Sequence, residues 1–212
     1  MKKSTTRIAG AITFLALILT TFLSVGVPAN AGKPPALTPG QKVLNTAIAA
    51  LGSGPSLVMT SAQISAGEAW CSEFGSYVYT KGGAGNLFTL GTPGTAINTS
   101  TNKWVTWATA NNRLRWSNPA LKLDPTLANT LSDPLLTPNV NIQPGDLVME
   151  WHWKTSTNAW STHTAIVESV AVVNGRRVFN TVDGNWNGIV KRRTVDTDLK
   201  GKIFAVVSPV NV

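Results

Sequence analysis

The chain has 212 residues, with 18 basic and 10 acidic side chains, a formal net charge of +8, one cysteine and two histidines. A single cysteine excludes an intramolecular disulfide, and one cysteine with two distant histidines does not make an ordinary zinc site. The positive charge suits an anionic polymer such as a cell wall and gives little support to nucleic acid as a partner. We therefore expect no cofactor and no nucleic-acid partner.

The first 31 residues have the pattern of a secretory signal peptide. Three basic residues within the first seven precede an apolar stretch from Ile8 to Val27, and Ala29-Asn30-Ala31 supplies a small-x-small cleavage pattern. Cleavage would remove three basic residues and leave a mature charge of +5. We predict a secreted monomer that associates with the cell wall and has no membrane contact after cleavage. An uncleaved membrane anchor is the alternative, because about twenty apolar residues could just span a bilayer.

The mature chain is expected to form one domain. Residues 32–40 contain three prolines and predict a flexible lead-in, so the domain would cover residues 41–212. Apolar residues at helical spacing predict helices over Gln41–Leu51, over the Cys71 segment from a start after Ser65 or Gly67 to Lys81, and around Asn102–Asn111. The stretch 84–142 is otherwise rich in Thr, Asn and Pro, and no function can be read from it.

From Gln143 onward the pattern changes to strands. Alternating and β-branched residues predict strands at Leu147–Trp153, Thr164–Val173, Arg176–Val182, Gly188–Arg193 and Ile203–Val207. Helices first and antiparallel strands afterwards indicate an α+β fold, with N-terminal helices packed on a C-terminal antiparallel sheet.

Cys71 is a candidate nucleophile, because a free thiol in an exported protein is prone to oxidation and its presence is easier to explain by chemistry than by packing. The alternative is a cysteine that packs as a small hydrophobe. It lies near the start of its predicted helix, in the second turn if Ser65 is the N-cap and in the first turn if Gly67 is. His163 opens a strand-like run and is the candidate base. His152 lies between two tryptophans and is expected to serve the strand rather than catalysis.

Asp183 and Asn185 follow on the next strand and could orient the histidine. Asn174-Gly175 predicts a hairpin between the two strands. A two-residue loop would pair Val173 with Arg176 and turn both orienting residues away from His163. A three-residue loop with a bulge would place His163 opposite Asn185, with Asp183 as its diagonal neighbour. We therefore predict the three-residue loop.

Four segments in this order resemble the signatures of CHAP domains, which are papain-like cysteine amidohydrolases and peptidases. They are Trp70-Cys71-Ser72-Glu73-Phe74, Gln143-Pro144-Gly145-Asp146-Leu147-Val148, His163-Thr164-Ala165-Ile166-Val167-Glu168 and Asp183-Gly184-Asn185-Trp186. The resemblance covers about Gln41 to Val207.

The resemblance implies a papain-like fold and hydrolysis of a peptidoglycan amide through a thioester. It implies that Cys71 is the nucleophile, His163 the general base, and Asp183 with Asn185 the pair that supports the histidine. Aspartate stands where glutamate is common in the family, so the orienting role stays open between the two.

Trp70 and Trp186 are the expected substrate contacts, with core packing as the alternative for Trp186. Calcium stays open, because Asp183 and the segment Asp196-Thr197-Asp198 offer oxygens, but there is no EF-hand pattern. The expected activity is that of a secreted peptidoglycan amidase or endopeptidase. The alternatives are an exported peptidase or effector acting on another amide, and a catalytically silent wall-binding protein.

Overall fold

A computed structural model of the chain describes residues 35–85, 101–129, 140–174, 176–196 and 201–212. The predicted signal peptide and the first three residues of the predicted lead-in, 32–34, lie outside these ranges. Residues 36–212 form one compact unit. Within the described ranges, no helix has the length and apolar character needed to cross a membrane.

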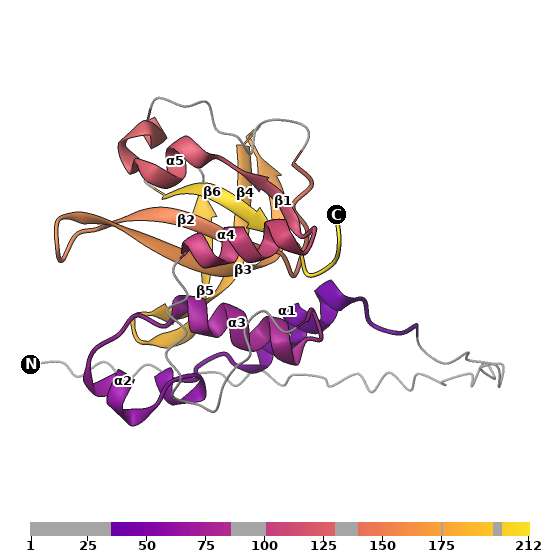
Figure 1. Cartoon of the computed structure of the whole chain (residues 1–212), viewed down its shortest axis with the longest axis horizontal. Coiled ribbons are helices and arrows are strands. Elements are labelled where there is room, and N and C mark those ends of the chain that lie inside the picture. The colour runs from indigo at the N-terminus through magenta and orange to yellow at the C-terminus, as the bar shows by residue number, and fades with distance from the viewer. Residues whose placement is uncertain (1–34, 86–100, 130–139, 175, 197–200) are drawn as a thin grey trace, which may run out of the picture. The chain divides into compact units, whose positions relative to one another are not determined.

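A six-stranded antiparallel sheet is the centre of this unit (Figure 1). The strand order is β1-β6-β2-β3-β4-β5, so the last strand of the chain is inserted beside β2. The strands are β1 Leu114–Ser117, β2 Leu147–Lys154, β3 Ala159–Val173, β4 Arg176–Trp186, β5 Ile189–Asp196 and β6 Gly201–Val207. Together with the helices they confirm the predicted α+β class, and β1 is the one strand that the sequence pattern did not predict.

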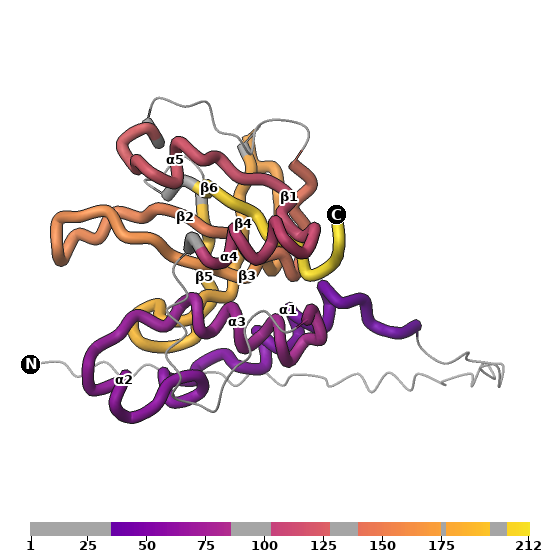
Figure 2. The backbone as a smooth tube through the Cα atoms, viewed as in Figure 1, coloured from indigo at the N-terminus to yellow at the C-terminus, as the bar shows by residue number. Residues whose placement is uncertain are grey.

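Within the described ranges five α-helices accompany the sheet, and the tube in Figure 2 follows their path. They are α1 Pro39–Ala49, α2 Ser61–Ser65, α3 Cys71–Lys81, α4 Thr101–Ala110 and α5 Pro119–Leu123, with short 3-10 helices at Pro55–Leu57 and Pro125–Asn129. Helix α1 begins at a capping box in which Thr38 and Gln41 each accept a backbone hydrogen bond from the other. Helices α1 and α3 pack together, and both contact β3.

Both faces of the sheet are covered by apolar side chains, as the alternation along a strand requires. Leu147 and Met149 belong to the cluster shared with the helices, whereas Val148 between them belongs to a second cluster. Buried residues that join the first cluster from α1, α3 and α4 are Val43, Ala47, Phe74, Val78, Tyr79, Trp104 and Ala108. The core therefore fixes α3 against the strands that carry the candidate histidine and its partner.

The hairpin between β3 and β4 differs from the predicted one. Val173 pairs with Arg176, so the connection is the two-residue loop and the predicted three-residue loop is wrong. A bulge lies further along β3, because Val167 pairs with Thr181 while Ser169 pairs with Asn180, which leaves Glu168 as the extra residue. This one-residue shift restores the register in which His163 lies at the level of Asn185.

Candidate active site

Cys71 is the first residue of α3, and Trp70 occupies the N-cap position. Neither Ser65 nor Gly67 begins this helix, because Ser65 ends the separate helix α2. Backbone N–H groups in the first turn of a helix have no partner within the helix, and the helix dipole favours negative charge there. The half-buried thiol therefore lies where a thiolate, or an oxyanion formed beside it, is stabilised.

Two glycines allow α3 to approach the sheet closely enough to bring Cys71 to the site. A Cβ on Gly184 of β4 would lie 2.3 Å from the Cβ of Phe74, which is sterically impossible without movement. A Cβ on Gly75 of α3 would lie 2.7 Å from a methyl carbon of Leu147 in β2. The Asp-Gly-Asn sequence of β4 thus has a packing reason for its glycine as well as polar neighbours on either side.

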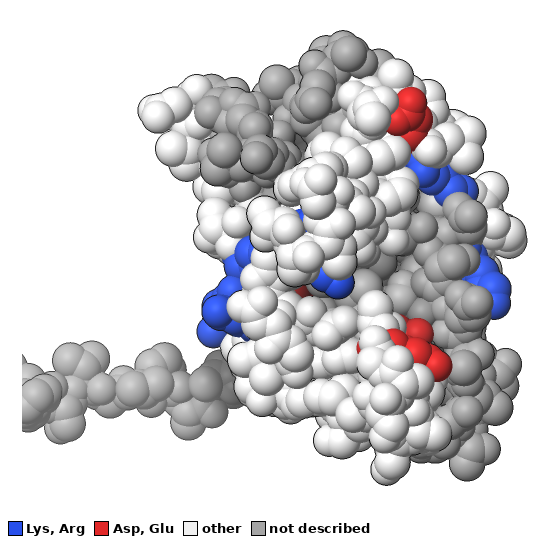
Figure 3. Space-filling model, turned by 90° about the vertical axis from the view of Figure 1, so that its left-hand side faces the viewer, with Lys and Arg blue, Asp and Glu red and all other residues white. Residues whose placement is uncertain are grey.

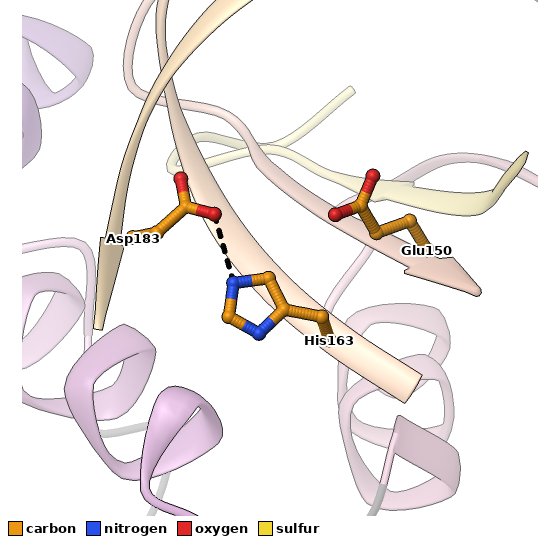
Figure 4. A group of neighbouring side chains, drawn as sticks. All are labelled: Glu150, His163 and Asp183. Atoms are coloured by element: carbon orange, nitrogen blue, oxygen red, sulfur yellow. Dashed lines mark hydrogen bonds and ion pairs between the residues drawn. The ribbon is translucent and has the colours of Figure 1, made fainter. Parts of the chain in front are cut away.

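His163 is buried and hydrogen-bonds Asp183, with 2.8 Å between Nε2 and the carboxylate oxygen Oδ2 (Figure 4). Nδ1 points away from Asp183 in Figure 4, and the side chain also hydrogen-bonds Cys71. Asp183 is fully buried, and its other oxygen accepts from the hydroxyl of Thr181. Asp183 rather than Asn185 therefore fixes the imidazole, and Asn185 has a left-handed backbone with φ of 59°.

The environment favours a thiolate and an imidazolium. Burial acts to raise the pKa of the Cys71 thiol, but hydrogen bonding to His163, the charge of His163 and the nearby Thr164 outweigh it and lower this pKa. Burial acts to lower the pKa of His163, but hydrogen bonds to Asp183 and Cys71, with their negative charges, raise it. The proton of the thiol is therefore drawn to the imidazole in the folded protein.

Two further charged residues complete the cluster, and the sequence reading missed both. Arg193 on β5 donates from Nε to Asp183 Oδ2 at 2.7 Å and from its terminal nitrogen to Glu150. Glu150 is fully buried in β2 and pairs directly with His163 in the β2–β3 register. Glu150 could have been identified from the sequence, because it is a carboxylate within an apolar strand. Arg193 could not, because it is one of three consecutive basic residues and nothing in the sequence distinguishes it from the other two.

Glu150, His163 and Asp183 also place three potential metal ligands within 4.8 Å of one another (Figure 4). Both carboxylates are ion-paired with Arg193, so the guanidinium already supplies the positive charge that the acidic pair requires. Of the calcium oxygens considered above, those of Asp183 are engaged by His163, Thr181 and Arg193, and Thr197 and Asp198 lie outside the described ranges.

The aromatic residues divide between the site and the core. Trp186 is half-buried, with its ring centroid 5.3 Å from that of His163 and 4.3 Å from the guanidinium carbon of Arg193. Trp70 is only 2 % exposed and belongs to the core cluster, so it does not agree with the expected substrate contact. The ring centroids of His152 and His163 are 5.7 Å apart. Burial and neighbouring positive charge lower the pKa of His152 to about 4, so this residue is neutral at pH 7.

Charge is spread thinly over the face drawn in Figure 3. Most of the described surface in that view carries neither sign, and the basic side chains lie in separate small groups. The described part of this face therefore shows no continuous basic stripe of the kind that follows a nucleic-acid backbone.

Comparisons of the chain with protein-family models, with curated proteins and with solved structures found no match.

Proposed function

We propose that this protein is a secreted cysteine-dependent hydrolase of peptidoglycan, an amidase or endopeptidase with the papain-like fold of CHAP domains. The observation that carries the proposal is the chain of contacts from Cys71 at the head of α3, through His163, to the buried Asp183. A nucleophile, a base and an orienting group in hydrogen-bonding sequence are the requirement for acyl transfer at a thiol. The wall polymer as substrate rests on the four motifs, the signal-like N-terminus and the positive charge.

The reaction follows from the two protonation states. The thiolate sulfur of Cys71 attacks the amide carbonyl carbon, and the carbonyl oxygen becomes an oxyanion that the backbone N–H of Cys71 can stabilise. His163 gives its proton to the departing amine nitrogen, which leaves a thioester on Cys71. His163 then takes a proton from water, the resulting hydroxide attacks the thioester, and the carboxylic acid is released with the sulfur restored as a thiolate.

Zymography with purified cell walls tests this function on the mature protein. Wild type should clear the walls, and Cys71→Ala and His163→Gln should not, because each removes a group that changes its bonding during the reaction. Glu168→Gln is the matched control, since it removes a surface carboxylate that pairs with Arg192 and should leave clearing intact. Mass analysis of the released fragments then identifies the broken bond.

The same experiment separates the alternatives. Wall retention without clearing in both wild type and Cys71→Ala would indicate a binding protein. Absence of both retention and clearing, with a reactive Cys71, would indicate a peptidase or effector that acts on another amide.

A further inference from the structure

Five ionisable side chains from four elements face one another around His163. Cys71 comes from α3, Glu150 and the neutral His152 from β2, Asp183 from β4 and Arg193 from β5. Apart from His152, they alternate in charge when the thiol is ionised: Glu150, Arg193, Asp183, His163, Cys71. Glu150 and Asp183 are fully buried, and the side chain of Arg193 is 14 % exposed. A buried carboxylate such as Glu150 needs a structural or chemical reason, because burial disfavours its charge.

Arg193 has the geometry of a clamp on Asp183. Its guanidinium donates to Asp183 and Glu150 through different nitrogens, and its planar face lies over the ring of Trp186. A guanidinium can hold two carboxylates at once because its donors diverge in one plane, which an ammonium cannot reproduce. Asp183, Glu150 and Trp186 therefore hold Arg193 in place. Arg193 in turn fixes Oδ2 of Asp183, the oxygen that also accepts a hydrogen bond from His163.

Glu150 has two connections to the imidazole. It lies opposite His163 in the β2–β3 ladder (Figure 4). Its carboxylate also forms an ion pair with the terminal nitrogen of Arg193. Its negative charge favours the imidazolium directly and balances the positive charge that Arg193 would otherwise impose.

We propose that Glu150 and Arg193 are positioning residues of the active site: Arg193 holds Asp183 against His163, and Glu150 anchors Arg193 and stabilises the imidazolium. The proposal rests on the proposed function in so far as it concerns turnover. Its electrostatic part concerns only the thiolate–imidazolium pair and can be measured without a substrate.

The rate of Cys71 alkylation by iodoacetamide, followed against pH on the mature protein, is the first test. Wild type should show one step where the ion pair forms and a second, at higher pH, where His163 loses its proton. Glu150→Gln keeps the shape and an acceptor for Arg193 but removes the negative charge. Both steps should therefore move to lower pH, the second by about one unit.

Glu168→Gln is the matched control, because Glu168, on the strand β3 that carries His163, makes an ion pair with Arg192 of β5 at the surface. Its profile should coincide with that of wild type. Equal profiles for Glu150→Gln and Glu168→Gln would overturn the electrostatic role. Steps that shift in Glu150→Gln, in a protein that clears no wall, would refute the proposed function and leave this inference standing.

Arg193→Lys tests the clamp in the hydrolysis assay, with Arg192→Lys as its control. Lysine keeps the charge but cannot bridge both carboxylates, so kcat should fall about tenfold while KM stays the same, since Arg193 acts through Asp183. A change in KM alone, or a kcat equal to that of Arg192→Lys, would refute the positioning role.

Discussion

The Cys71–His163 pair determines how activity should depend on pH. The thiol pKa is lowered and the imidazole pKa is raised, so the ion pair exists at pH values between the two. As pH falls through the lowered pKa of Cys71, the thiolate takes a proton and attack stops. As pH rises through the raised pKa of His163, the acid that protonates the leaving amine is lost.

We therefore predict a plateau of kcat/KM with an acid limb below the ordinary thiol pKa of about 8.5 and a basic limb near the raised pKa of His163, about 10. The measurement is the initial rate of wall-fragment release at low substrate concentration from pH 4 to 10. A single rise near pH 8 to 9 would mean that the thiol titrates alone and that the pair does not form.

Asp183 and Asn185 can be separated by substitution, because only Asp183 bonds the imidazole. Asp183→Asn removes the negative charge that raises the pKa of His163 and can present an amide donor to the wrong ring nitrogen. We expect kcat to fall by about 10² to 10⁴ and the basic limb of the pH profile to move to lower pH. Asn185→Ala should reduce kcat much less. The opposite ranking of the two variants would return the orienting role to Asn185.

At the scale of elements, the site depends on how closely α3 lies against β4. Gly184 has no room for a side chain because Phe74 lies against it. Gly184→Ala should push the helix from the strand, separate Cys71 from His163, lower activity at least tenfold and destabilise the fold by about 1 to 3 kcal/mol. Gly54→Ala is the control, since a Cβ there has no atom within 4 Å. Activity and urea denaturation of both variants provide the comparison.

The elements also explain what the sequence could predict. Helices α1 and α3 and the strands from β2 onward have clear periodicity, so their existence followed from the pattern. The bulge at Glu168 has no such signal, because nothing in the composition of β3 shows where one extra residue is inserted into its pairing with β4. The predicted pairing of His163 with the Asp183–Asn185 segment was reached by placing the extra residue in the turn. The structure has it at Glu168, within β3.

Long-range partners were less accessible still. Arg193 and Glu150 are 43 positions apart in the chain, and their strands β5 and β2 are separated in the sheet by β3 and β4. The stretch 84–142 hid β1 and α5, which have four and five residues and are too short for periodicity to define.

At the scale of the whole molecule, Tyr79 ties the helical layer to two neighbouring strands of the sheet, β6 and β2. Its buried hydroxyl donates to the carbonyl of Val207 at the end of β6 and accepts from the N–H of Leu147 at the start of β2. Burial and the nearby charge of Asp146 raise the pKa of this phenol, so the hydroxyl stays protonated and keeps both bonds at any working pH.

Tyr79→Phe would leave two buried backbone groups without a partner, at about 1 to 3 kcal/mol for each. We predict a loss of at least about 2 kcal/mol in the free energy of unfolding, with activity of the folded protein retained, because no atom of the site changes. Tyr77→Phe is the matched control on the same helix: Tyr77 is half-buried, and its loss of a hydroxyl should cost less than about 0.5 kcal/mol. Urea unfolding followed by tryptophan fluorescence measures both. Equal stabilities would show that the core alone, without this pair of hydrogen bonds, holds α3 on the sheet.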